Sequence, residues 1–225
     1  MALIPSSLPL AVLNPNSSEN VTRTIADAVR AAQGDEAHRF EFVTLHDGPP
    51  GIVSQADADL AAAQVQAWVR QHGAHYSAIM VACFSDPGLG AARAATTTPI
   101  IGLGEAGMQT ALAAGKGVGV LAVASVAIPR HMRYWAQLGV ADRVTGERAI
   151  DLTVAQSGDH ALAFERLRTA GLALRDEDGA DVLLLGCAGM ASLCAPLQDA
   201  LGMLVVEPCA AAAQAAWAAR NTWAT

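Results

Sequence analysis

The chain has 225 residues, 52% of them hydrophobic and 16% charged, and its formal net charge is −7. A chain of this size can bury a large core, but it offers no basic surface for the phosphates of a nucleic acid. Its apolar runs fall well short of the roughly 20 residues of a membrane helix, and the N-terminus lacks the features of a signal peptide.

The four cysteines predict free thiols rather than a structural framework. They include no Cys-x-x-Cys pair, and they are too few for a disulfide scaffold or a zinc ribbon in a chain of this length. We therefore expect a cytoplasmic protein that acts on a small molecule, with no nucleic-acid or membrane partner and no metal.

In chain order, short apolar runs alternate with Ala-rich stretches of helical period, which is typical of β-α units on a parallel sheet. Ser17 or Ser18 caps the first predicted helix and Gly34 ends it, while the second runs from near Gln55 to Gly73. The strands that this pattern predicts are residues 8–13, 40–45, 78–82, 99–102, 118–124, 148–152, 182–186 and 203–206.

The later helices carry their own start and stop residues. Pro129 predicts the first turn of a helix that ends near Gly139, and Ser157 or Asp159 caps a longer one that reaches about Glu177. The Ala-rich stretch 210–223 predicts a last helix that packs back on the sheet.

The order of elements indicates an internal duplication. Residues 79–83 form an apolar strand that ends in Cys83, and residues 183–187 repeat the pattern with Cys187. We predict an α/β fold of two pseudo-symmetric parallel-sheet halves with the active site in the cleft between them. The first half comprises residues 1–106 and is completed by the C-terminal helix at 207–225, and the second half comprises residues 107–206.

The two strand-end cysteines are the strongest candidates for chemistry. Ligands of parallel α/β sheets bind beyond the carboxyl ends of the strands, where turns and helix N-termini offer free N–H groups. Such a position is expected to lower the pKa of a cysteine. One cysteine at the end of an apolar strand is most simply a small core residue, but two at matching ends favour a function.

A pair of facing thiols suits proton transfer at carbon. Moving a proton between the two faces of one carbon needs a base on one side and an acid on the other, and nearby N–H donors would hold the enolate oxygen that forms between them. Cys83 and Cys187 are the predicted acid/base groups, and this chemistry requires no cofactor.

Other motifs are weaker. The G-x-G-x-x-G pattern at 102–107 follows a strand, but no acidic residue for a ribose lies about 20 positions later. His72 and His75 are expected to be exposed residues at a helix end rather than metal ligands. Cys194 and Cys209 are expected to be structural.

Four ordered segments carry a resemblance to a known family: LNPNS at 13–17, ACFSDPGL at 82–89, IGLGEA at 101–106 and LGCAGM at 185–190. Together they resemble the hydantoin racemase branch of the aspartate/glutamate racemase superfamily, over nearly the whole chain. The resemblance implies a substrate held between two halves, a cofactor-free racemisation that falls on Cys83 and Cys187, and a homo-oligomer.

The residues after each cysteine bear on the substrate. Amino-acid racemases of this superfamily tend to carry Asn-Thr and Thr-Glu there, where this chain has Phe84-Ser85 and Ala188-Gly189. The more apolar lining favours a neutral ring such as a 5-substituted hydantoin or allantoin. An aspartate/glutamate racemase, a maleate isomerase-like enzyme and a non-catalytic small-molecule binding protein remain alternatives.

The predicted substrate-binding residues all lie at strand ends. The N–H groups after each cysteine are expected to grip the ring carbonyls, and polar side chains that follow the first strand of each half are expected to bind ring edges. The predicted set is Asn14, Asn16, Phe84, Ser85, Asp86, Ser125, Ala188 and Gly189.

Overall fold

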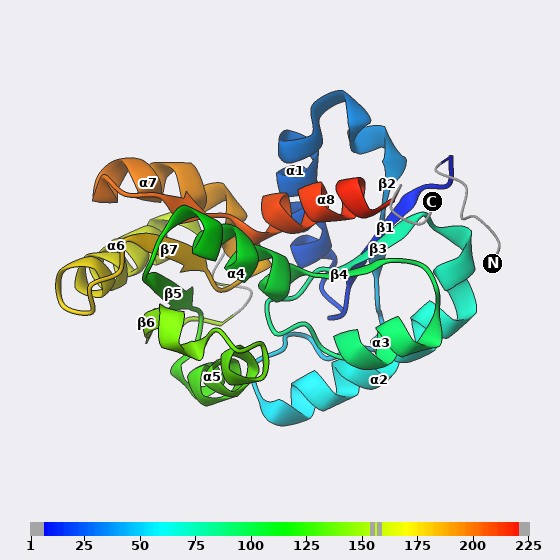
Figure 1. Cartoon of the computed structure of the whole chain (residues 1–225), viewed down its shortest axis with the longest axis horizontal. Coiled ribbons are helices and arrows are strands. Elements are labelled where there is room, and N and C mark those ends of the chain that lie inside the picture. The colour runs from blue at the N-terminus through cyan, green and yellow to red at the C-terminus, as the bar shows by residue number, and fades with distance from the viewer. Residues whose placement is uncertain (1–6, 154–155, 157–158, 221–225) are drawn as a thin grey trace.

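The computed structural model describes residues 7–153, 156 and 159–220, and in this part of the chain the strands form two parallel sheets of the same topology. Figure 1 shows the two sheets in separate lobes, with α8 lying across the middle. The predicted α/β fold of two related parallel-sheet halves is confirmed. The first sheet has the strand order β2-β1-β3-β4, with β1 Leu10–Asn14, β2 Phe40–Thr44, β3 Ala78–Val81 and β4 Ile100–Gly102. The second sheet has the order β6-β5-β7-β8, with β5 Val118–Ala122, β6 Val144–Ala149, β7 Val182–Leu185 and β8 Val205–Val206.

The central strands are continuous apolar runs because helices cover both faces of each sheet. β1, β3, β5 and β7 are buried along their whole length. The sheet order places β3 beside β1 and β7 beside β5, so the segments that follow β3 and β7 occupy equivalent positions in the two halves. This equivalence positions the two strand-end cysteines.

Capping residues fix the ends of the first two helices, among them the predicted Ser18 and Gly34. Ser18 accepts a hydrogen bond from Val21 N, and Gly34 ends the helix with φ 54°. Ser54 forms a capping box with Asp57 at the start of the second helix. The helices are α1 Glu19–Gln33, α2 Gln55–His72, α3 Leu89–Ala95, α4 Leu103–Ala114, α5 Ile128–Gln137, α6 His160–Asp176, α7 Cys194–Leu201 and α8 Pro208–Ala219.

One strand prediction is displaced. Residues 148–152 were expected to form the strand, whereas β6 begins at Val144 and ends at Ala149. Ile150 and Leu152 still run beside β5, because their N–H groups donate to Ala122 O and Val123 O. Asp151 has φ 48°, which breaks the extended conformation after the strand. The apolar residues that suggested the strand are therefore buried just beyond its end.

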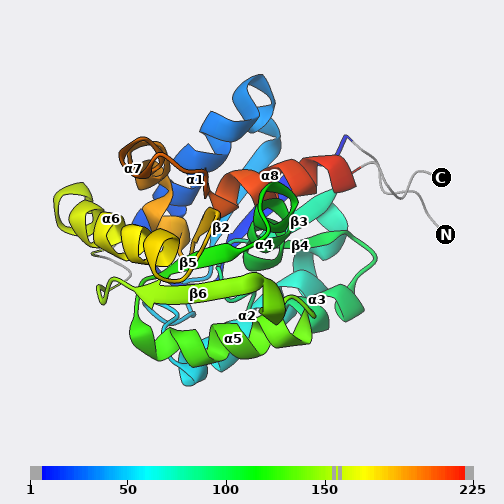
Figure 2. The same ribbon diagram turned by 60° about the vertical axis from the view of Figure 1, so that its left-hand side comes forward.

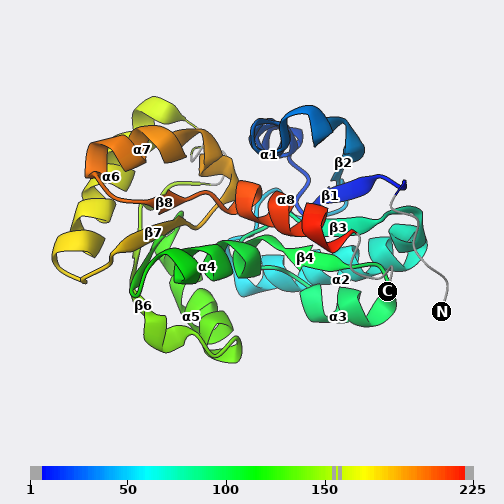
Figure 3. The same cartoon turned by 45° about the horizontal axis from the view of Figure 1, so that its top comes forward.

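The last helix packs against the first sheet. α8 packs against α1 and α4, and it contacts β3 and β4 of the first sheet. Figure 3 shows it between the two lobes, beside α1 and α4. The predicted seam at Ala106 falls inside α4, and the division of the chain there stays a prediction. Residues 221–223 of the predicted last helix lie outside the described residues.

Within the described residues, no helix is both long and apolar enough to cross a membrane.

Candidate active site

A pocket lies between the segments that follow β3 and β7, and both strand-end cysteines line it. Its empty space is about 540 Å³, counting the part open to solvent. The lining comes from both halves: Asn16, Val21, Ile52, Val53, Ala82, Cys83, Phe84, Ser85, Val123, Ala124, Ala127, Arg130, His131, Gly186, Cys187 and Ala188. Of the predicted site, the structure thus brings Cys83 and Cys187 together with Asn16, Phe84, Ser85 and Ala188.

The turns that carry the cysteines have matching hydrogen bonds. The N–H of Ser85 donates to the Cys83 sulfur, and the N–H of Gly189 donates to Cys187 Sγ over 3.4 Å. One residue further along each turn, Asp86 N donates to Cys83 O at 2.9 Å and Met190 N donates to Cys187 O at 3.2 Å. The duplication that the sequence predicts therefore extends to the main-chain contacts of the two thiols.

The electrostatics of Cys83 differ from the expectation. Burial raises the pKa of this thiol to about 12, and the nearby carboxylate of Asp86 raises it further. The Ser85 N–H and the cation of Arg130 act in the expected direction and lower the pKa, but burial outweighs them. The prediction of a lowered pKa is wrong for Cys83, which holds its proton at neutral pH.

Asp86 does not line this pocket. Its carboxylate accepts hydrogen bonds from Gly104 N at 3.0 Å, Glu105 N at 2.7 Å and Tyr134 Oη at 2.8 Å. Burial raises the pKa of Asp86 to about 7, although these three hydrogen bonds oppose the shift. Its own N–H is used within the turn, so it is not free to grip a ring carbonyl.

The capping role of Asp86 also accounts for the glycine-rich segment at 102–107. A Cβ on Gly102 would lie 2.5 Å from Asp86 Oδ2, and a Cβ on Gly104 would lie 2.1 Å from Phe84 O. The glycines allow the turn after Cys83 to pack against the start of α4. An internal carboxylate occupies the helix N-terminus where a dinucleotide phosphate would otherwise bind.

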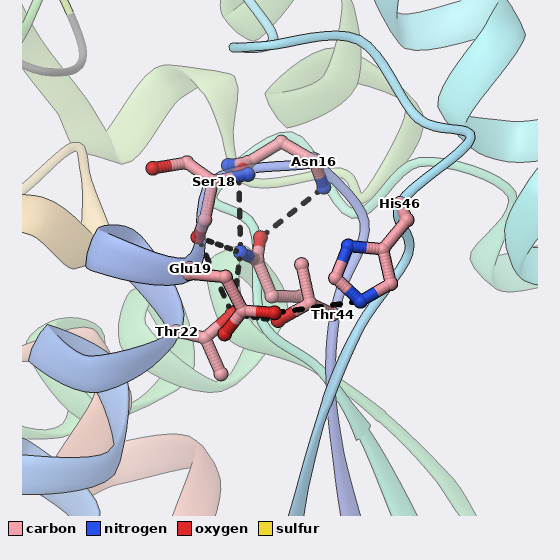
Figure 4. Close-up of polar contacts among 7 residues, drawn as sticks. Asn16, Ser18, Glu19, Thr22, Thr44 and His46 are labelled. Carbon is pink, nitrogen blue, oxygen red and sulfur yellow. Dashed lines mark hydrogen bonds and ion pairs between the residues drawn. The ribbon is translucent and has the colours of Figure 1, made fainter.

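Asn14 supports the pocket from behind. The side chain is fully buried, and its Nδ2 lies 3.0 Å from Asn16 Oδ1, 3.1 Å from Ser18 O and 2.9 Å from Thr22 Oγ1. Figure 4 shows this network, in which Thr22 also contacts Thr44 over 2.6 Å. Asn14 therefore holds the turn that brings Asn16 to the pocket and does not itself line it.

Two further predicted residues lie off the pocket wall. Ser125 is exposed, and its N–H donates to Asp151 Oδ1 at 2.8 Å. Gly189 is buried, and its N–H is directed at the sulfur of Cys187 rather than at the pocket.

The contribution of α5 to the pocket was not predicted from the sequence. Arg130 and His131 both line the pocket, and the Nδ1 of His131 donates to Glu147 Oε1 over 2.5 Å in a pair that is almost completely buried. His131 Nε2 lies 3.5 Å from Ser85 Oγ, and its ring meets Phe84 edge-on. Pro129 correctly predicted this helix just beyond the end of β5, but not that its side chains reach the pocket.

The remaining cysteines have structural contacts. Cys194 donates its S–H to Val205 O at 3.2 Å, and Cys209, in the first turn of α8, is fully buried in the core. Neither is among the described residues that line the pocket. In the described part of the chain, no group of three or more His, Cys, Asp and Glu side chains could hold a metal ion.

The chain folds into two related parallel-sheet halves, and each half contributes one thiol to a single pocket. This arrangement is that of a two-lobed α/β enzyme. The family model for Asp/Glu/Hydantoin racemase matches residues 10–216, and the chain belongs to this family. The predicted family is confirmed, and the protein is a racemase, which makes it an isomerase.

Similar proteins support this assignment along most of the chain. A hydantoin racemase of Rhizobium meliloti is 32% identical over 207 residues, which covers 91% of this chain and 86% of that protein. The structure of an allantoin racemase from Klebsiella pneumoniae has a TM-score of 0.87 at 30% identity and covers 94% of this chain and 87% of its own. An allantoin racemase from Pseudomonas fluorescens has a TM-score of 0.85 at 27% identity, with 94% and 90% covered.

Proposed function

We propose that this racemase interconverts the enantiomers of 5-substituted hydantoins or of allantoin by proton transfer between two thiols. The observation that carries the proposal is that Cys83 and Cys187 line one pocket on turns with matching hydrogen bonds. The similarity to hydantoin and allantoin racemases supports the substrate class.

The proposed reaction has two proton transfers. The thiolate of one cysteine takes the proton from the reacting ring carbon, so an S–H bond forms, the C–H bond breaks and the electron pair moves to the neighbouring carbonyl oxygen. The thiol of the other cysteine then delivers its proton to the opposite face, which restores the carbonyl and leaves a thiolate. The roles exchange for the reverse direction.

The state of Cys83 fits the acid role in this scheme. Because burial raises its pKa to about 12, this sulfur carries the proton that is delivered to the substrate. The Ser85 N–H stabilises the thiolate that remains after delivery. Cys187 receives equivalent support from Gly189 N and would act as the base for the same enantiomer.

The remaining lining favours a ring of low polarity. Ile52 and Val53 from the β2–α2 loop, Phe84 and Val123 supply apolar walls around the thiols. An apolar pocket with a few polar groups suits a small cyclic amide better than a zwitterion. From the family resemblance we also propose a homo-oligomer. From the sequence we propose a cytoplasmic location and a division of the chain into two halves near Ala106.

An amino-acid racemase is the second candidate function. Arg130 places a cation in the pocket wall, and a guanidinium is the usual partner of a substrate carboxylate. Aspartate and glutamate therefore belong in the substrate panel.

The test is racemisation by the full chain. Optically pure hydantoins, allantoin, aspartate and glutamate are incubated in deuterated buffer, and chiral chromatography with mass spectrometry follows inversion and deuterium uptake above the spontaneous rate. Inversion of a hydantoin or of allantoin supports the proposal, whereas inversion of only the amino acids favours the second candidate. Binding of panel compounds without exchange would make the protein a non-catalytic binder.

Cysteine variants identify the reacting groups. Cys83→Ser and Cys187→Ser should each lower kcat by at least about 10²-fold, the range for loss of one acid/base group. Cys194→Ser is the matched control, because its hydroxyl can still donate to Val205 O. Full activity in either of the first two variants would overturn the two-thiol assignment.

A further inference from the structure

Arg130 bridges the two halves beside the pocket. It lies in the first turn of α5, and its Nη1 donates to Ser54 O at 3.1 Å, just before α2. Arg133, one turn later, reaches Gln55 Oε1 at 3.3 Å. In Figure 2, α5 and α2 lie on the same lower side of the molecule. Of these two arginines, Arg130 lines the pocket that holds the thiols and Arg133 does not.

The other edge of the Arg130 guanidinium is buried without a protein partner. Its Nε and Nη2 atoms are inaccessible to solvent, and no described residue accepts a hydrogen bond from either. Nearly all buried donors in folded proteins have an acceptor, so two orphaned donors on one side chain call for explanation. Nε–H and Nη2–H point the same way and form the fork that binds an oxyanion or a carbonyl oxygen.

The Arg130 guanidinium interacts electrostatically with Cys83. Burial lowers the pKa of Arg130. When Cys83 is ionised, its thiolate opposes this shift more than Asp57 on α2 or Glu147 on β6 does. Arg133 on its own helix acts in the opposite sense. The Arg130 guanidinium and the Cys83 sulfur line the same pocket and are close enough for their charges to interact.

We infer that Arg130 is the substrate-recognition residue of this pocket, and that its free guanidinium edge binds the oxygen attached next to the reacting carbon. This inference rests on the proposed function and defines its substrate class: the molecule must carry a carbonyl or carboxylate oxygen adjacent to the acidic C–H. The same edge meets the negative charge that this oxygen gains as the proton leaves, which is where a fixed donor accelerates the reaction.

A purely structural role makes a different prediction. Glu147 Oε2 is also buried without a partner among the described residues, so Arg130 could serve only to balance this carboxylate. In that case Arg130→Gln would weaken the fold and leave kcat and KM of the folded protein unchanged.

The test compares Arg130→Gln and Arg130→Lys with Arg133→Gln as the matched control on the same helix. Loss of one such donor typically lowers kcat by about 10²–10³-fold, so we expect this fall for Arg130→Gln, a rise in KM, and values close to wild type for Arg133→Gln. Arg130→Lys keeps the charge but not the fork, so it should stay impaired in kcat. In Arg130→Lys, the retained charge should allow iodoacetamide to alkylate Cys83 at nearly the wild-type rate. In Arg130→Gln, loss of the charge should slow this alkylation, because the Arg130 cation lowers the pKa of Cys83.

Alkylation also separates this inference from the proposed function. If the wild-type protein racemises nothing in the panel, the proposed function fails, but the inference stands if panel compounds protect Cys83 from iodoacetamide in the wild type and not in Arg130→Gln. Equal protection in both proteins, no protection in either, or unchanged kcat and KM in Arg130→Gln would overturn it.

Discussion

The backbone N–H of Gly189 donates to the sulfur of Cys187 over 3.4 Å, and the N–H of Ser85 makes the equivalent contact with Cys83. The main chain of its own turn thus donates a hydrogen bond to each sulfur. Because β3 and β7 occupy the same place in their sheets, the duplicated topology brings both contacts to one pocket. A reaction with interchangeable acid and base roles fits such a repeated arrangement.

The buried state of Cys83 predicts a low reactivity at neutral pH. With a pKa of about 12, the thiolate fraction should rise about tenfold for each pH unit between pH 7 and 9, without the plateau that free cysteine shows near its pKa of about 8.5. Alkylation by iodoacetamide, followed at the Cys83 peptide by mass spectrometry, measures this profile. A plateau below pH 9 would contradict the burial argument.

Asp86 predicts a loss of stability as the pH rises. Its folded pKa of about 7 exceeds the ordinary value of 3.8, so its contribution to the free energy of unfolding is fully present below about pH 4 and is lost as the pH rises through 7. A shift of this size corresponds to a few kcal/mol, roughly 1.4 kcal/mol per pH unit. Asp86→Asn should remove this slope in urea unfolding between pH 4 and 7.

Asp57 provides the control of opposite sign. Hydrogen bonds from the backbone and side chain of Ser54 lower its pKa below 3.8, so its contribution is present above that pH and is lost only at lower pH. Asp57→Asn should therefore leave the pH 4 to 7 slope unchanged. The same slope in wild type and Asp86→Asn would refute the assignment.

Gly104 allows α4 to pack closely against the turn that follows Cys83. A Cβ at this position would lie 2.1 Å from Phe84 O, so Gly104→Ala must displace the turn and should cost about 1–3 kcal/mol together with most of the activity. Gly90, in α3, has nothing within 4 Å of its Cβ position. Gly90→Ala should therefore stabilise the fold by about 0.5–1 kcal/mol. Urea unfolding and the racemisation assay report both effects, and equal behaviour of the two variants would contradict the packing argument.

The buried pair of His131 and Glu147 should contribute more to the free energy of unfolding than an exposed ion pair does. Their side chains are only 5% and 1% exposed, and removal of one partner from such a buried pair costs about 3–5 kcal/mol. Glu147→Ala should lower the free energy of unfolding by this amount. Glu177→Ala, which removes a carboxylate from the exposed pair with Arg148, should unfold like wild type. A small effect of Glu147→Ala would mean that this pair does not hold α5 against β6.

The sequence predicted the features that depend on local pattern. Most strands and helix ends were located from the apolar runs and from Ser18, Gly34 and Asp159, because burial and capping act over a few residues. The repeated strand with a terminal cysteine led to both lining thiols.

Features that depend on tertiary contacts could not be predicted from the sequence. Arg130 and His131 face the thiols only because α5 packs beside the start of α2. Asp86 turns away from the pocket because α4 presents two N–H groups to it. Burial decides the pKa of Cys83, and depth of burial is set by how the two halves close on each other.

The labelling pattern at early times in deuterated buffer tests the two-thiol mechanism most directly. One optically pure, slowly exchanging hydantoin is converted by the wild-type protein to a few per cent, and both enantiomers are then analysed by mass spectrometry. If separate thiols serve the two faces, the newly formed enantiomer carries deuterium at the reacting carbon while the recovered substrate keeps hydrogen. Equal deuterium in both enantiomers would mean that a single base serves both faces, which contradicts the roles assigned to Cys83 and Cys187.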